Sequence, residues 1–352
     1  MTQPDDTRAA QNGEAGCRAG GWRVAVVGAT GVVGTTMLEL LRSRGFPADE
    51  IVPLASARSA GRELEGGLVV QDLERADLSG FDLALFSAGA TISRLWAPRF
   101  VSEGAVVVDN SSAFRRDPEV PLVVSEVNPD ALRGHHGLIA NPNCSTMALL
   151  VAIAPLHRAV GIERLVVATY QSVSGTGKAA IDELDAQAHA SLHGMEMPAP
   201  AIYPEPIGFN VIGAAGSFAD GDDHTDEERK MMFETRKILE DETIGVAVTC
   251  VRVAVRVSHS LAVNVQTRQP LSVERAYELL RNAPGVTLDP LPTPLKAEGR
   301  DDVLVGRVRG DESHPRALSL WVVGDNLRKG AATNAIQIAE LLTGVPAARG
   351  AS

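Results

Sequence analysis

Residues 22–34 read WRVAVVGATGVVG. The first half is an apolar run that ends at Gly28, and apolar residues with helical spacing follow from Thr35 to Ser43. Glycine allows the tight backbone angles of a strand-to-helix turn, and it lets a phosphate approach the amides at a helix N-terminus. This GxxGxxG variant of the usual GxGxxG pattern is therefore a candidate phosphate-binding loop, although a glycine turn that binds nothing is the alternative. The candidate contacts are Gly28, Thr30, Gly31, Val32, Val33 and Gly34.

Further short apolar runs follow this segment and alternate with helical or turn sequence. Near-continuous apolar strands that alternate with helices are typical of a parallel sheet covered on both faces. The first part of the chain is therefore predicted to be a Rossmann-type dinucleotide-binding domain of the α/β class. The candidate strands are Ile51–Ser56, Phe81–Ser87, Ala105–Asn110 and Leu122–Ser125.

The pattern changes after Asn143. A long apolar helix is predicted first, and longer strands with alternating polarity come later. Alternation leaves one face of a sheet wet, so the second domain is predicted to be α+β with an antiparallel or mixed sheet. The expected elements are helix Ser145–Val160, strand Ile162–Ser174, helices Ala179–His193 and Asp226–Asp241, strands Gly245–Arg256 and Leu261–Gln269, and a short helix from Val273.

A length of 352 residues favours two domains. We expect the first over 21–143 plus 328–347, because a final helix near Gly330–Leu342 could return to it, and the second over 144–327. Residues 1–20 are polar and lack periodicity, which predicts a disordered leader.

Composition excludes several classes of function. The net charge is −11 and no Lys/Arg-rich stretch occurs, which argues against nucleic acid or an anionic membrane as a partner. No signal peptide is visible, and no apolar run approaches the ~18 residues of a membrane helix. Three scattered cysteines (Cys17, Cys144 and Cys250) suit a reducing compartment, so a cytoplasmic protein is expected. No metal site is expected.

The second strand runs into Ser56-Ala-Arg58-Ser59. An NAD-preferring enzyme usually carries an acidic residue at this place, where it binds the ribose hydroxyls. A guanidinium with flanking hydroxyls suits a 2′-phosphate instead, so NADP is the expected cofactor. The alternative is that Arg58 is a solvated loop residue.

Cys144 directly precedes a predicted helix, and helix amides stabilise a thiolate, so we expect a lowered pKa for this thiol. His259 follows Arg252 by seven residues, and a neutral imidazole could accept a proton from the thiol or from a thiohemiacetal hydroxyl. Taken alone, each has an ordinary alternative: a buried cysteine, a structural histidine or a surface arginine. Together they are typical of covalent acyl chemistry.

The chain resembles the aspartate-semialdehyde dehydrogenase family over about Trp22–Thr343. Nine of its segments occur in the order found in that family, which chance does not explain. They are GATGVVG (28–34), SARSAG (56–61), FSAG (86–89), DNSSAFR (109–115), NPNCST (141–146), TYQSVSGTG (169–177), EERKM (227–231), CVRVAVRVSHS (250–260) and DNLRKGAA (325–332).

The resemblance implies a role for each matching residue. Cys144 would be the acylated nucleophile, His259 the acid/base that assists hydride transfer, and Gln171 the group that orients the acyl intermediate. Arg252 would pair with the substrate carboxylate. The second domain would then be catalytic and dimerising. The remaining implied contacts are Glu227 with the substrate amino group, Lys230, Arg115 and Asn110 with phosphate, and Ser174, Gly175 and Asn326 with the cofactor.

The implied reaction is the NADPH-dependent reductive dephosphorylation of 4-phospho-L-aspartate to L-aspartate 4-semialdehyde through a cysteine thioester. It belongs to the biosynthesis of lysine, diaminopimelate, threonine and methionine, and a homodimer or homotetramer is expected. The chain departs from the family at Thr176, where alanine is frequent, and at Leu261, where related members often have glutamate. The choice between Glu227 and Glu228 stays open, with three-residue spacing to Lys230 favouring Glu227.

Three rival interpretations fit these residues less well. N-acetyl-glutamyl-phosphate reductase shares the cofactor fold and the cysteine, but its substrate has no free ammonium to pair with Glu227. Glyceraldehyde-3-phosphate dehydrogenase has a different cysteine segment. A non-catalytic paralogue that keeps only the fold would have lost Cys144 or His259.

Overall fold

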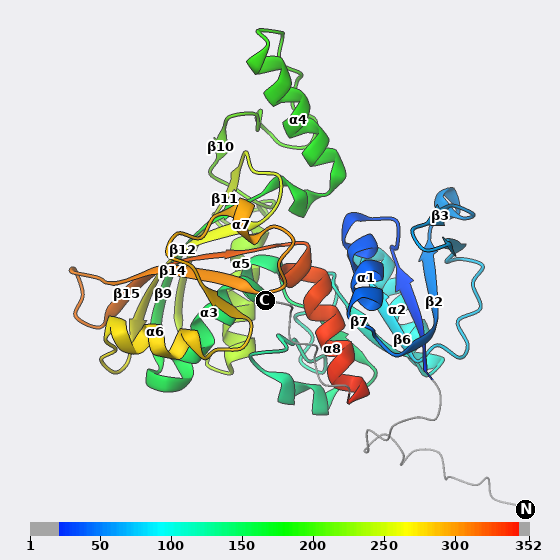
Figure 1. Cartoon of the computed structure of the whole chain (residues 1–352), viewed down its shortest axis with the longest axis horizontal. Helices are drawn as coiled ribbons and strands as arrows, with labels where there is room; N and C mark the ends of the chain where they lie inside the picture. Colours follow the sequence, from blue (N-terminus) through cyan, green and yellow to red (C-terminus); the bar gives the residue numbers. More distant parts are fainter. Residues whose placement is uncertain (1–20, 345–352) are drawn as a thin grey trace, which may run out of the picture.

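The computed structural model describes residues 21–344. Two sheets lie side by side, each covered by its own helices (Figure 1). The predicted leader and residues 345–347 of the predicted first domain lie outside the described residues.

The first sheet is entirely parallel, as predicted, with strand order β5-β2-β1-β6-β7-β8. The helices α1 (Val32–Ser43) and α8 (Thr333–Thr343) pack on one face, and α2 (Ala90–Ser102) packs on the other. The strands are β1 (Trp22–Val27), β2 (Ala48–Ala55), β5 (Gln71–Asp72), β6 (Leu83–Phe86), β7 (Val106–Asp109) and β8 (Leu138–Ala140), and a small hairpin is formed by β3 (Glu63–Leu64) and β4 (Leu68–Val69).

One predicted strand is wrong. Leu122–Ser125 forms only a single bridge, between Leu122 and Ala140. The side chain of Asn128 takes the place of a neighbouring strand, because it accepts from the Val124 N–H at 2.9 Å and donates to the Leu122 carbonyl at 2.9 Å. A side chain can thus satisfy the backbone of an apolar run without a ladder.

The second sheet is mixed, as expected, with order β10-β11-β9-β12-β15-β14-β13. Neighbours β9 and β11 are parallel, whereas β12 runs antiparallel to both β9 and β15. One face is covered by α3 (Cys144–Val160), α5 (Asp226–Leu239) and α6 (Val273–Arg281). The strands are β9 (Ile162–Gln171), β10 (Val211–Ile212), β11 (Gly245–Val253), β12 (His259–Thr267), β13 (Val286–Leu288), β14 (Val303–Gly310) and β15 (Ala317–Gly324).

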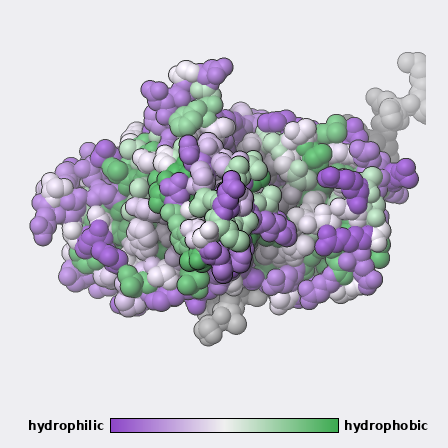
Figure 2. Space-filling view, turned by 90° about the horizontal axis from the view of Figure 1, so that it is seen from above, coloured by the Kyte–Doolittle hydropathy of each residue, from purple (hydrophilic) through white to green (hydrophobic). Residues whose placement is uncertain are grey.

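The helix α4 (Lys178–Leu192) projects away from the second sheet together with the loop that follows it (Figure 1). Seen from above in Figure 2, this side of the molecule carries hydrophobic residues in its middle part and more hydrophilic residues toward both ends. The large exposed apolar side chains near the projection are Leu192, Met195, Ile202, Phe209, Val211 and Phe218.

The chain returns to the first sheet through a turn of π-helix, Arg328–Ala332, which leads directly into α8. Buried residues of α8 such as Ile336 and Ile338 belong to the same core as α1. A short helix α7 (Pro294–Ala297) completes the fold. Within 21–344 no helix is long and apolar enough to cross a membrane.

Candidate active site

A cavity of about 250 Å³ lies where the two parts of the chain meet. It is lined by residues from the start of α1, the segment after β7, the start of α3, the ends of β9 and β11, the start of β12, the first turns of α5 and the π-helical turn. Twelve of the predicted site residues line it: Val33, Asn110, Arg115, Cys144, Gln171, Ser174, Gly175, Glu227, Lys230, Arg252, His259 and Asn326.

Cys144 is the first residue of α3. The side chain of Asn143 caps this helix, accepting from the Ser145 N–H at 2.9 Å and the Thr146 N–H at 3.4 Å. Burial, together with the charge of Glu227, raises the pKa of the Cys144 thiol to about 11, against the opposite effect of nearby arginines. The expectation of a lowered pKa is therefore wrong, because burial outweighs the helix amides and Asn143 already occupies two of them.

His259 begins β12 and is almost fully buried. Its Nδ1 accepts from the Ser172 backbone N–H at 3.0 Å, so the proton of a neutral ring lies on Nε2. Burial, helped by Arg252, lowers the pKa of His259 to about 3. Nε2 is buried without a hydrogen-bond partner among the described residues and lies beside the cavity. The ring thus presents a donor, where the sequence suggested a proton acceptor.

Arg252 and Gln171 lie opposite each other in the register of β11 and β9. Arg252 is 6% exposed, and one guanidinium nitrogen donates to the Ser172 carbonyl at 2.7 Å. Its Nε has no partner, and the residue makes no ion pair within the part of the chain that the structure describes. A buried cation without a counter-ion is costly, so this group is suited to an anionic ligand in the cavity.

Arg115 is also buried, but its charge is matched within the protein. It forms an ion pair with Glu234 at 3.0 Å and donates to the Asn110 carbonyl at 3.0 Å. The other oxygen of Glu234 accepts from the Asn143 N–H at 2.7 Å. Glu234 therefore joins the predicted phosphate-binding arginine to the cap of the cysteine helix.

Glu227 and Lys230 form an ion pair at 2.8 Å, as their spacing on α5 allows, and Lys230 also contacts Asp226 at 2.6 Å. Both line the cavity, and Glu227 accepts from the Asn143 side chain at 2.7 Å. Glu228 lies elsewhere: it completes a capping box with Thr225 and accepts from a backbone N–H of β11. The geometry favours Glu227 over Glu228.

The glycine loop packs closely against the protein's own backbone. A Cβ added at Gly28 would lie 2.4 Å from the Ser87 carbonyl oxygen, and one at Gly34 would lie 2.2 Å from the Gly28 oxygen. Gly28 also has a φ of +86°, which side-chain-bearing residues rarely adopt. Gly31 caps α1 without a side chain, which leaves the helix N-terminus open to a ligand.

The remaining predicted cofactor contacts fall into two groups. Ser56, Arg58 and Ser59 follow β2, and Arg58 is exposed without an ion pair in the described residues. Ser174 and Asn326 are buried and bonded to each other at 2.9 Å, beside Gly175. Only the second group borders the cavity.

Sequence reasoning missed Glu234, Asn143 and Gly330 as parts of the site. Asn143 stands next to the cysteine in an N-cap position, so the capping rule could have found it. No local signal marks Glu234, because its partners come from segments far away in the chain. Cys250 does not line the cavity: it is buried against Met231, and burial raises its pKa to about 12.

Two family models match the chain: the semialdehyde dehydrogenase NAD binding domain over residues 23–135 and the semialdehyde dehydrogenase dimerisation domain over residues 153–329. The aspartate-semialdehyde dehydrogenase of Streptomyces akiyoshiensis is 51% identical, over 91% of this chain and 98% of that protein.

Solved structures agree with these matches. Aspartate semialdehyde dehydrogenase II from Vibrio cholerae, complexed with ASA, is 49% identical with a TM-score of 0.89, covering 92% of this chain and 98% of that one. Aspartate semialdehyde dehydrogenase with NADP from Candida albicans is 25% identical with a TM-score of 0.69, covering 92% and 99%.

Proposed function

The chain belongs to the aspartate-semialdehyde dehydrogenase family, and from that premise we propose that it reduces 4-phospho-L-aspartate to L-aspartate 4-semialdehyde with NADPH through a thioester on Cys144. One observation carries the proposal: a single cavity holds the Cys144 thiol, the unpartnered Nε2 of His259 and the uncompensated guanidinium of Arg252. The reaction would serve the biosynthesis of lysine, diaminopimelate, threonine and methionine. Free thiols at Cys144 and Cys250 support a cytoplasmic location.

The substrate would be held by its charges. Arg252 would bind the α-carboxylate, since it is a buried cation without a protein counter-ion. Glu227 would bind the amino group of the substrate. This new ion pair would replace part of the ion pair between Glu227 and Lys230. Lys230, so released, would join Arg115 and the Asn110 amide around the phosphate.

In the covalent step, the Cys144 thiolate attacks the acyl carbon, the carbon–oxygen bond to phosphate breaks, and inorganic phosphate leaves. NADPH supplies the hydride that reduces the thioester. His259 would direct its Nε2–H to the acyl oxygen, where negative charge develops. Gln171, buried at the end of β9, would orient the acyl group. Collapse of the thiohemiacetal oxyanion breaks the carbon–sulfur bond, releases the aldehyde and returns the thiolate.

The cofactor would lie along the glycine loop, with its phosphates at the N-terminus of α1 and its nicotinamide toward the Ser174–Gly175 turn and Asn326. The N-terminus of α1, which no side chain caps, supports this position. We propose NADP as the physiological cofactor, because the exposed, unpaired Arg58 suits a 2′-phosphate.

We propose that the protein works as a homodimer or a homotetramer. The match to a dimerisation domain supports an oligomer. The open face of the second sheet offers Val166 and Tyr170, each 37% exposed, and Tyr170 contacts the Trp321 ring at a centroid distance of 5.4 Å. An apolar and aromatic sheet face is suited to pairing with a second copy.

The test is a steady-state assay with aspartate semialdehyde, inorganic phosphate and either NADP or NAD, comparing the wild type with Cys144→Ser and Cys250→Ser. We expect activity with NADP to be at least about tenfold higher than with NAD, as one lost charged contact predicts. Cys144→Ser should be inactive yet still bind NADP, because serine is a poor nucleophile at neutral pH. Cys250→Ser should stay active. Substantial turnover by Cys144→Ser would exclude the thioester route.

A further inference from the structure

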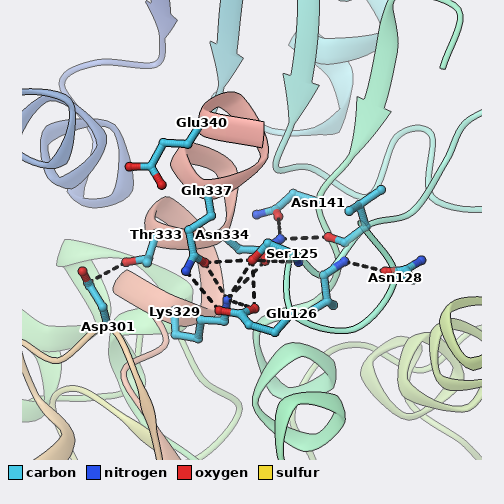
Figure 3. Close-up of polar contacts among 12 residues, drawn as sticks. Ser125, Glu126, Asn128, Asn141, Asp301, Lys329, Thr333, Asn334, Gln337 and Glu340 are labelled. Atoms are coloured by element: carbon cyan, nitrogen blue, oxygen red, sulfur yellow. Dashed lines mark hydrogen bonds and ion pairs between the residues drawn. The ribbon is translucent and has the colours of Figure 1, made fainter. Parts of the chain in front are cut away.

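Lys329 is fully buried, and every acceptor around its ammonium is a side chain (Figure 3). Its Nζ lies 2.5 Å from a Glu126 carboxylate oxygen and 2.7 Å from Gln337 Oε1. Asn334 Oδ1 at 3.3 Å and Ser125 Oγ at 3.4 Å complete the shell. Burial lowers the pKa of Lys329, and Glu126 opposes this effect. Although burial opposes it, Lys329 in turn holds the pKa of Glu126 below its usual value.

This lysine belongs to the π-helical turn Arg328–Ala332. Gly330 N–H donates to the Asp325 carbonyl at 2.9 Å, and Ala332 N–H donates to the Leu327 carbonyl at 3.1 Å. These i→i−5 bonds make a wide turn of a kind that is rare and mostly found at functional sites. Contacts with surrounding residues stabilise a turn of this shape. On one side of the turn, the buried ion pair between Lys329 and Glu126 provides such a contact.

The other side of the same turn is a wall of the active-site cavity, formed by Leu327, Gly330 and Ala331. A Cβ added at Gly330 would lie 2.7 Å from the Cβ of Cys144, so the turn is in direct contact with the nucleophile. The Ala331 carbonyl accepts from the Asn141 side chain at 3.0 Å. The turn therefore lies between the buried cluster and the reactive cysteine.

A second connection runs through amide side chains. Asn334, which accepts from Lys329, donates to Asn141 Oδ1 at 2.5 Å and to the Val123 carbonyl at 2.8 Å. Asn141 in turn donates to the Asn110 side chain, which lines the cavity. Figure 3 shows Asn141, Asn334 and Lys329 in this continuous set of contacts.

We propose that Lys329, through its ion pair with Glu126, is a positioning residue. It holds the π-helical turn in contact with Cys144 and so sets the position of the thiol in the cavity. The consequence for turnover rests on the proposed function, whereas the placement of the thiol does not. Lys329 itself touches no reacting atom.

The test compares two carboxylate-to-amide changes. Glu126→Gln removes the counter-charge of Lys329. Asp241→Asn, the control, breaks an ion pair with Arg268 at 2.7 Å just after α5, and neither of these residues lines the cavity. For Glu126→Gln we expect kcat to fall by about 10- to 100-fold, as misplaced reacting groups do, with KM for aspartate semialdehyde changed by less than roughly threefold. The rate of alkylation of Cys144 by iodoacetamide should also change, while Asp241→Asn should lower only the melting temperature.

A purely structural role would give equal losses of melting temperature in both variants, with kcat and alkylation per folded molecule unchanged, and would overturn the proposal. If Glu126→Gln does not fold, Gly330→Ala decides, because it changes the contact with Cys144 and spares the ion pair: an unaltered alkylation rate would refute positioning. Retained activity in Cys144→Ser would instead remove the proposed function, and the alkylation comparison would still test the placement of the thiol.

Discussion

Cys144 carries a thiol whose protonated form is favoured, since burial and the Glu227 charge raise its pKa to about 11. At pH 7 such a thiol is ionised to only roughly one part in ten thousand. Glu227 is also the group proposed to bind the substrate ammonium. An ammonium placed there would cancel the charge that opposes ionisation, so substrate binding itself would favour the thiolate.

Glu227→Gln tests this coupling. Removing the carboxylate charge should lower the thiol pKa and speed alkylation of Cys144 by iodoacetamide at pH 8 by about threefold to tenfold, up to one pKa unit. Turnover of aspartate semialdehyde should nevertheless fall, because the ammonium loses its partner. The matched control is Glu228→Gln, whose side chain contacts Thr225 and β11 and does not line the cavity. Slower alkylation in Glu227→Gln would mean that this carboxylate activates the thiol.

His259 shows how one backbone contact sets a side chain's chemistry. The Ser172 N–H donates to Nδ1 at 3.0 Å, which directs the imidazole proton to the cavity on Nε2. Burial keeps the ring neutral at physiological pH, since its pKa is lowered to about 3. Its contribution in this state is a hydrogen bond to developing negative charge, not transfer from an imidazolium.

Among the elements, the loop between β1 and α1 has very close backbone contacts. Gly34 packs on Gly28, and no side chain fits between them, whereas a Cβ at Gly31 would meet its nearest atom at an ordinary 3.4 Å. The strand and the helix can therefore approach only if position 34 is glycine.

Two alanine substitutions separate packing from ligand contact in this loop. Gly34→Ala should destabilise the protein by about 1–3 kcal/mol, as overpacking does, and weaken NADP binding by more than roughly tenfold. Gly31→Ala should leave the melting temperature nearly unchanged because its φ of −80° suits alanine. Thermal melts and NADP titration by fluorescence measure both quantities. A stable Gly34→Ala variant with normal affinity for NADP would contradict the proposed cofactor site at this loop.

At the scale of the whole molecule, the two parts are tied together by charge as well as by core packing. Arg44 at the end of α1 is bonded to Glu340 on α8 and to Asp301, which precedes β14. Asp301 also pairs with Arg328 in the π-helical turn at 2.9 Å. These ion pairs connect the π-helical turn, which lines the cavity, to elements that belong to both sheets.

The open face of the second sheet should form the subunit interface. Val166→Glu places a charge at the centre of β9, where burial against a second copy would be costly, so we expect the oligomer to dissociate. Light scattering coupled to size exclusion measures the mass. Val69→Glu, at a more exposed apolar position in β4, should leave the mass unchanged. An intact oligomer in Val166→Glu would move the interface elsewhere, with the projecting α4 segment as the next candidate.

The sequence by itself determined the features that depend on neighbours along the chain. The glycine loop, the parallel first sheet, the mixed second sheet and the spacing of Glu227 and Lys230 follow from backbone geometry and periodicity, which are local properties. The end of one predicted strand differs: β9 ends at Gln171, not at Ser174, because a 3₁₀ turn over Val173–Thr176 follows.

Only the tertiary structure decided the electrostatics of the site. The raised pKa of Cys144, the proton on His259 Nε2 and the pairing of Arg115 with Glu234 all depend on segments that are far apart in the chain and meet at the cavity. The same is true of Leu122, where a side-chain amide replaced a strand partner. Burial and long-range charge set these properties, and neither can be read from residue type or spacing because both arise only when the elements pack.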